Sequence, residues 1–259
     1  MPFKKFLQML RNRNAALVAL CLFALFLYWK SGYEQEQKRY RDIKLHLLPE
    51  GGRAFVQEDQ LLETLTEHEL LPANRRISDV ELDVLEARVS QNPFCLDVEA
   101  YWDIEGNLHL DFQQRQPLAR VIDRRNRSYY IDEQLKIMPL SGLFTARVPL
   151  ITGAIDEKPT FNDTLKSDAG RKVTAIARAL RKMSFLRLVS NQIRLEKKGA
   201  LVLISSFKHH RFILGDTSNL EKKLLKLKVF YREILPRKGW DAYDTVYLNY
   251  QNQIVANNR

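Results

Sequence analysis

The pattern of apolar and polar positions divides the chain into three parts. An unbroken apolar run, residues 15–29 (AALVALCLFALFLYW), contains no charged residue. Behind it, residues 42–116 alternate between apolar and polar, then repeat at helical spacing, and then alternate again. Residues 117–259 hold many short alternating segments and two longer helical ones. These changes of period predict a membrane segment followed by two mixed α+β domains.

The apolar run is predicted to be an uncleaved signal anchor. It covers roughly 22 Å, and the interfacial Tyr28, Trp29 and Lys30 extend it. Four basic residues and no acidic one precede it, which favours a cytoplasmic N-terminus, and no small-residue cleavage motif follows. These flanks disfavour a cleaved signal peptide or a buried core helix. We expect a cytoplasmic tail (1–14), one transmembrane helix (15–32), a juxtamembrane stalk (33–41) and an exported remainder. The anchor residues are Leu17, Leu20, Phe23, Phe26 and Trp29.

Residues 42–116 are predicted to form one compact domain with the order strand, helix, helix, strand, strand. Ser78 and Glu81 have the spacing of a capping box before the second helix. Gly106-Asn107 predicts the turn of the closing hairpin. The expected elements are the strand 42–48, the helices 57–70 and 79–90, and the strands 94–102 and 108–112.

Residues 117–259 are predicted to form a β-rich domain with two helices. The second of these is amphipathic, is expected to start after a capping Asn219, and carries most of its lysines away from its leucines. The expected helices are 168–183 and 220–234. The expected strands are 117–123, 128–132, 137–140, 148–152, 192–196, 201–205, 211–215, 245–250 and 253–255.

Charge is segregated along the chain, whose net charge is +10. Residues 50–111 carry 15 acidic and 4 basic side chains, whereas residues 112–259 carry 28 basic and 13 acidic. The basic part suits anionic lipid, an anionic wall polymer or an acidic protein. Nucleic acid is disfavoured, because the expected topology exports this part and no nucleic-acid motif appears. Cys21 lies in the anchor and Cys95 in the exported part, so no disulfide is expected.

Catalytic and metal-binding patterns are nearly absent from the sequence. Residues 205–208 (SSFK) match the Ser-x-x-Lys of penicillin-recognising acyl enzymes, but that tetrad must begin a helix, and here it follows a strand-like LVLI. The five histidines do not show metal-ligand spacing, and no phosphate loop is present. We therefore expect a binding protein, not an enzyme, with no cofactor, metal or small-molecule substrate.

A set of short stretches along nearly the whole chain has a characteristic order and spacing. The stretches are 55–59 (FVQED), 85–87 (LEA), 92–94 (NPF), 106–108 (GNL), 114–121 (QRQPLARV), 129–133 (YYIDE), 138–141 (MPLS), 146–153 (ARVPLITG), 214–216 (LGD), 222–224 (KKL), 239–240 (GW) and 247–255 (YLNYQNQIV). Together they resemble the FtsQ/DivIB family of bacterial cell-division proteins, in the form found in Bacteroidetes. One departure from that pattern is Leu135, where glycine is usual after the Tyr-Ile-Asp strand.

The resemblance implies a fold and a function. The fold is a single N-terminal transmembrane helix, a POTRA domain (βααββ, 42–116) and a β-domain (117–259). The function is that of a non-catalytic divisome scaffold in the bacterial inner membrane at the division septum, with its bulk in the periplasm. Such a scaffold recruits FtsB-like and FtsL-like single-span division proteins and influences septal peptidoglycan synthesis. The alternative is a POTRA-containing transport or secretion component, although no second POTRA-like repeat or barrel pattern follows.

The resemblance also implies that an FtsB-like partner pairs with the last strand of the β-domain, aided by the preceding helix. An edge strand leaves backbone N–H and C=O groups free for such pairing. Large side chains would anchor the added strand, and helix lysines would pair with partner carboxylates. The partner-binding residues that we predict are Tyr247, Leu248, Asn249, Tyr250, Ile254, Lys222, Lys223 and Lys226.

Overall fold

The computed structural model describes residues 17, 20–30, 41–48, 54–67, 76–156, 158–183, 185, 190–207 and 210–258. The chain divides into two compact units, and the first comprises Met1–Leu47, Glu58–Val89 and Val98–Phe112. The second comprises Leu48–Gln57, Ser90–Asp97 and Gln113–Arg259. The sequence predicts a single boundary after residue 116, whereas the structure interleaves the two units.

Aromatic packing explains why residues 48–57 belong to the second unit. The Phe55 ring stacks on Phe94 with centroids 5.7 Å apart and meets Phe144 edge-on at 5.2 Å. Its backbone N–H donates to Gln114 Oε1 at 2.8 Å, and its carbonyl accepts from Ser141 Oγ at 2.8 Å. These contacts join segments that are distant in sequence. A local pattern of apolar residues cannot predict such contacts, so it could not assign residues 48–57 to the second unit.

The apolar run contains a helix over residues 20–30. The predicted anchor residues Leu17, Leu20, Phe23, Phe26 and Trp29 all have exposed side chains. None of the helices in the described ranges combines the length and apolar character that a membrane crossing requires. The tail 1–14 and most of the stalk 33–41 lie outside the described residues, so the anchor stays a prediction.

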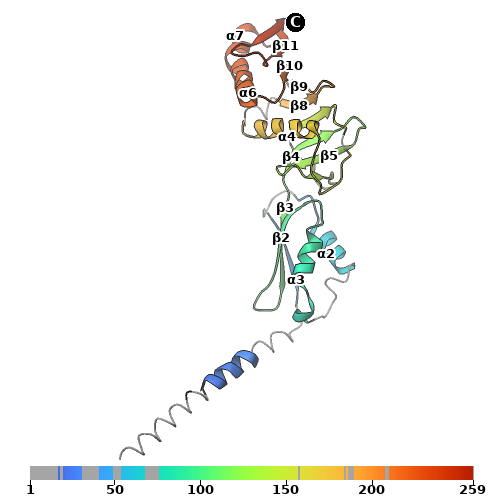
Figure 1. The fold of residues 1–259 in the computed structure, drawn as a ribbon, viewed down its shortest axis with the longest axis vertical. Coiled ribbons are helices and arrows are strands. Elements are labelled where there is room, and N and C mark those ends of the chain that lie inside the picture. The colour runs from blue at the N-terminus through green and yellow to red at the C-terminus, as the bar shows by residue number, and fades with distance from the viewer. Residues whose placement is uncertain are drawn as a thin grey trace, which may run out of the picture. The chain divides into compact units, whose positions relative to one another are not determined.

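The first unit has the element order that the sequence predicts, and Figure 1 shows its two helices beside the β2–β3 hairpin. Its three-stranded sheet has the order β1-β3-β2. Alternate residues of β3 are buried, and Leu108, Leu110 and Phe112 are fully enclosed. The elements are β1 (Ile43–Leu48), α2 (Glu58–Glu67), the 3₁₀ turn η1 (Ile77–Asp79), α3 (Leu82–Val89), β2 (Cys95–Trp102) and β3 (Leu108–Gln114).

The predicted capping box before α3 is wrong. Ser78 lies inside η1 and its hydroxyl bonds to Asp79 Oδ1 at 3.2 Å instead of capping a helix. The first helical hydrogen bond runs from Leu85 N to Glu81 O at 3.0 Å, so α3 starts three residues later than expected. The 3₁₀ turn takes the position of the expected first α-helical turn, and the buried Val80 separates the two helical pieces.

The second unit contains a sheet whose strand order, over the described residues, is β12-β11-β10-β9-β8-β7-β4-β5-β6. The predicted meander β8–β9–β10 is confirmed as an antiparallel run. The elements are β4 (Pro117–Ile122), β5 (Ser128–Asp132), β6 (Ile137–Met138), β7 (Leu150–Gly153), α4 (Asp168–Arg181), β8 (Ser190–Leu195), β9 (Leu201–Ser205), β10 (Arg211–Gly215), α6 (Leu220–Val229), the π-helical η2 (Phe230–Ile234), α7 (Leu235–Lys238), β11 (Tyr243–Tyr247) and β12 (Val255–Asn258).

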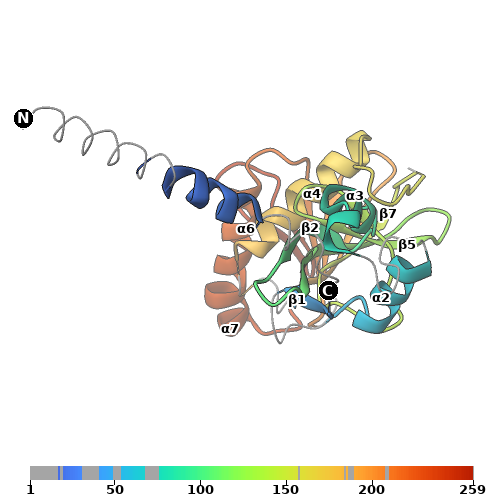
Figure 2. The same cartoon turned by 90° about the horizontal axis from the view of Figure 1, so that it is seen from below.

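Helical crossovers connect two of the parallel strand pairs in this sheet, whereas the parallel pair β4–β7 is connected through β5, β6 and a loop. The helix α4 connects β7 to the parallel strand β8, and the continuous helical segment α6–η2–α7 connects β10 to the parallel strand β11. Such crossovers are required because adjacent parallel strands cannot be joined by a tight turn. Figure 2 shows α6 and α7 in the same reddish part of the unit, with α4 in yellow.

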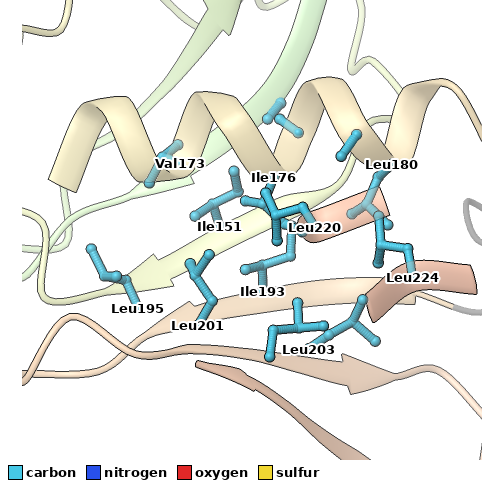
Figure 3. Close-up of a cluster of buried hydrophobic side chains, with 14 of the residues drawn as sticks. Ile151, Val173, Ile176, Leu180, Ile193, Leu195, Leu201, Leu203, Leu220 and Leu224 are labelled. Atoms are coloured by element: carbon cyan, nitrogen blue, oxygen red, sulfur yellow. The ribbon is translucent and has the colours of Figure 1, made fainter. Parts of the chain in front are cut away.

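The core of the second unit lies between one face of the sheet and the helices α4 and α6. Figure 3 shows Val173, Ile176 and Leu180 pointing from α4 toward the strand residues Ile151 and Ile193. Side chains from α6 join the same cluster, which is buried throughout. Ser167 caps α4 by accepting a hydrogen bond from Gly170 N at 2.9 Å. The 3.6-residue period of these helices is therefore explained by burial against one sheet face.

The end of the chain differs from the prediction. The expected strands 245–250 and 253–255 are observed as β11 (Tyr243–Tyr247) and β12 (Val255–Asn258), joined by a turn. The two strands pair antiparallel, with Tyr247 opposite Val255 and Val246 opposite Ala256. Asn219 is the N-cap residue of α6 as expected, but it adopts a left-handed conformation and its side chain forms no cap bond.

Candidate protein-binding site

The outermost strand of the large sheet is β12, which pairs with β11 on one side and, among the described elements, with nothing on the other. Val255, Asn257 and Asn258 are exposed, and Ala256 is half-buried. A strand in this position presents a row of free backbone donors and acceptors. The other edge strand, β6, has only two residues and is flanked by an isolated bridge between Lys136 and Thr164. The end at β12 is thus the better template for an added strand.

Five of the predicted partner-binding residues surround the turn before β12. Tyr250 is 46% exposed, Asn249 is exposed, and the rings of Tyr247 and Tyr250 lie 6.2 Å apart. Leu248 is fully buried, and Ile254 packs against the core. Tyr247 and Tyr250 therefore form an aromatic surface beside the edge strand, whereas Leu248 is a core residue.

The three predicted lysines occupy different environments. Lys223 is 6% exposed, and its ammonium group contacts Asp216 Oδ1 at 2.6 Å and Asp216 O at 2.9 Å. Lys226 donates to the backbone carbonyls of Leu248 and Tyr250 and so fixes the turn before β12. Lys222 is exposed. Lys222 therefore stays a predicted contact for a partner carboxylate, whereas Lys223 and Lys226 bind groups within the domain.

The ion pair of Lys223 changes the titration of its partner. The Lys223 hydrogen bond, followed by that of Ser218, lowers the pKa of Asp216 to about 2. Because Asp216 is mostly exposed, this interaction contributes only modestly to stability. It fixes the loop that precedes α6.

Sequence reasoning expected an edge strand at the end of the chain but placed it at residues 253–255, short of the observed β12 (Val255–Asn258). The predicted final strand ends at Val255 because the following Ala-Asn-Asn has low β-propensity. In the structure Ala256 packs against the core and Val246 lies opposite it, so tertiary contacts keep these residues extended. The polar Gln-Asn-Gln of residues 251–253 is typical of a turn and could have indicated that the last strand begins after it.

The Ser-x-x-Lys match lies at the end of a strand, as expected. Ser205 is the last residue of β9 and is buried. Its hydroxyl accepts from Tyr231 Oη at 2.6 Å and from Phe207 N at 3.0 Å, and burial raises the pKa of Tyr231. Lys208 lies outside the described residues. Ser205 therefore lies at the end of a strand and not at the start of a helix, and its hydroxyl accepts the hydrogen bond of the buried Tyr231 hydroxyl.

Two histidines that the sequence treats separately meet in the first unit. His46 Nε2 and His109 Nδ1 lie 3.1 Å apart, and His109 Nε2 lies 3.0 Å from Asp103 Oδ2. The His109 ring stacks between His46 and Tyr101, at centroid distances of 5.3 and 5.1 Å. Hydrogen bonds from Asn107, above all, hold the pKa of Asp103 far below its usual range. Within the described ranges, no group of three or more histidine, cysteine, aspartate or glutamate side chains could hold a metal ion.

Comparison with known proteins agrees with the resemblance noted in the sequence. A family model described as "FtsQ/DivIB, C-terminal related" matches residues 116–257, which is more than half of the chain. The chain is also 26% identical over 234 residues to the "Cell division protein FtsQ" of Salinibacter ruber (strain DSM 13855 / M31), covering 84% of this chain and 88% of that protein. The matched region includes the described strands of the large sheet, from β4 to the penultimate residue of β12. The chain belongs to the FtsQ/DivIB family.

Proposed function

We propose that this protein is a membrane-anchored, non-catalytic scaffold of the bacterial division machinery that recruits FtsB-like and FtsL-like single-span proteins. The single observation that carries the proposal is the open edge of β12, the outermost strand of the large sheet among the described residues. Family membership and the cell-division name of the Salinibacter ruber relative support a role in division. The apolar run and its basic N-terminal flank support the anchor in the inner membrane.

The binding mode is β-augmentation at β12. A partner segment adds as the next strand, pairing with the backbone of β12, and so extends the sheet. Tyr250, 46% exposed, supplies an aromatic contact at the adjacent turn, and Lys222 supplies a cation from α6. Aromatic side chains are the usual energetic centres of such interfaces. Because the backbone supplies the pairing, the partner segment must be extended and needs a suitable apolar anchor.

The order of elements and of strands in the first unit supports the proposal that it is a POTRA domain. Its elements follow the order β, α, α, β, β, with β3 between β1 and β2 in the sheet. We propose that this unit serves as a second contact module of the scaffold.

The experiment that tests the docking strand uses two proline variants, Ala256→Pro and Asn257→Pro. Successive residues of an antiparallel strand point their N–H groups alternately toward β11 and toward the open side. One proline therefore removes a ladder bond and destabilises the hairpin, whereas the other removes a donor on the open edge. We expect one of the two variants to keep the thermal stability of the wild type and yet lose co-purification of a co-expressed FtsB-like protein.

A photo-crosslinking residue placed at Tyr250 in living cells gives the complementary measurement, with Arg232 on η2 as the matched exposed control. We expect Tyr250 to capture a small single-span coiled-coil protein and Arg232 not to do so. Capture of that protein by neither position, together with full binding by both proline variants, would show that docking at β12 is wrong.

A further inference from the structure

A hollow of about 610 Å³ lies where three adjacent parallel strands end. The strands β4 and β7 pair in parallel, as do β7 and β8, so the carboxyl ends of the three strands lie side by side. The lining comes from the last residues of β7 and β8, from Ala154 directly after β7, and from the β4–β5 and β8–β9 turns. In open α/β sheets, ligand sites commonly lie at the carboxyl ends of the parallel strands.

Close approach of two backbones shapes this hollow. Gly153 has φ +115°, and a Cβ built on it would lie 2.1 Å from Leu195 O. Ala154 N donates to the same carbonyl at 2.7 Å. Only glycine permits this contact, because its backbone conformation and lack of a side chain bring the ends of β7 and β8 together. The result is a floor of small and apolar residues, with Ala154, Leu195 and Ala200 beside the glycine.

The rim of the hollow is strongly cationic. Arg124, Arg194, Lys197 and Lys198 are exposed, and none forms an ion pair with an acidic residue in the part of the chain that the structure describes. The acidic residue of the lining, Glu196, is 3.8 Å from the guanidinium of Arg211. Four cations thus surround a concavity in which one carboxylate is already engaged. Such a rim attracts anions and, through its arginines, favours bidentate contact with carboxylates.

From this geometry we propose that the hollow is a second docking site, which takes an acidic segment of a partner polypeptide. Its volume fits a few residues of peptide, and its apolar floor suits the small apolar side chains between carboxylates. A free inorganic anion would leave that floor unused. A membrane contacts a flat or convex face, whereas here the cations surround a concavity.

This site is separate from the edge at β12. In the sheet order β8 is followed by β9, β10, β11 and β12, so roughly 19 Å separate the two strands at the usual strand spacing. The inference does not rest on docking at β12, and it gives the β-domain two surfaces that two partners, or two parts of one partner, can occupy together.

The test measures fluorescence anisotropy of a labelled octapeptide of alternating glutamate and alanine added to the full chain in detergent micelles. The same peptide with glutamine in place of glutamate is the first control. The variant Arg194→Gln/Lys198→Gln should weaken binding of the acidic peptide about tenfold, since it removes two surface ion pairs. A second variant, Arg124→Gln/Lys197→Gln, should have the same effect.

The matched control variant is Arg232→Gln/Lys238→Gln, which removes equal charge from exposed positions outside the hollow. We expect it to retain wild-type affinity. Equal weakening by both kinds of variant would reveal unspecific charge attraction and overturn the proposal. Equal binding of the glutamine peptide, or complete displacement of the acidic peptide by millimolar phosphate, would also overturn it. The same holds if the protein binds vesicles of anionic lipid more tightly than the peptide and that binding is weakened by the Arg194→Gln/Lys198→Gln variant.

Discussion

Arg115 and Asp132 form a buried ion pair whose disruption we expect to destabilise the second unit strongly. The two side chains are 4% and 2% exposed, and Arg115 Nη1 lies 2.6 Å from Asp132 Oδ2. Arg115 Nη2 also donates to Cys95 O at 2.6 Å, while its buried Nε makes no hydrogen bond among the described residues. Removing one partner of such a pair costs about 3–5 kcal/mol, because the other charge stays buried.

The two single variants should differ within that range. Arg115→Met leaves a carboxylate that still accepts from Gln134 N and Lys136 N, each at 2.8 Å, so we expect a loss of about 3 kcal/mol. Asp132→Asn leaves a buried guanidinium whose Nε is already unsatisfied, so we expect about 5 kcal/mol. The double variant buries no charge and should fall within about 1 kcal/mol of Arg115→Met.

Equilibrium unfolding of the full chain in guanidinium chloride, followed by circular dichroism in detergent micelles, measures these differences. The control is Lys166→Met, which breaks an exposed pair with Asp163 and should cost at most about 1 kcal/mol. If Arg115→Met costs no more than Lys166→Met, or if the two single losses simply add in the double variant, the energetic coupling inferred from the geometry is wrong.

Two further predictions concern the same unit. Asp216 has a folded pKa of about 2, below its unfolded value, so its contribution is complete above pH ~4 and is lost as the pH falls toward 2. Asp216→Asn should flatten the stability–pH curve in that interval, whereas Asp244→Asn, which removes a carboxylate without an ion pair among the described residues, should not. Gly153→Ala should cost at least about 3 kcal/mol in denaturant unfolding, while Gly142→Ala, with nothing within 4 Å, should stay within ~0.5 kcal/mol.

Much of the fold could be predicted because it depends on local periodicity. The βααββ order of the first unit, the meander β8–β9–β10 and the helix α4 all follow from apolar residues at a period of 2 or 3.6. Local pattern also placed Ser205 correctly at the end of a strand and Asn219 directly before α6. Leu135 shows the limit of this approach, since it adopts φ 69°, the left-handed conformation that glycine usually supplies.

The candidate site could be predicted only in part. The sequence indicated that the last strands and the preceding helix belong together, and the structure places Tyr247, Tyr250 and Lys222 there. It could not show that Leu248 and Lys223 are buried, because which face a residue takes depends on register. Lys223 illustrates the point: on a helical wheel it looks solvated, yet it is enclosed and bound to Asp216.

By itself, then, the sequence determined the kinds of segments, the charge of each part and the family resemblance, because all of these are properties of neighbouring residues. Only the tertiary structure decided that β12 is the outer strand, that His46 meets His109, and that Arg124 lines the same hollow as the cations of β8 and of the β8–β9 turn. These features depend on which strands pair and in what order. Strand pairing is chosen by contacts between residues far apart in the chain, for which a one-dimensional pattern carries little information.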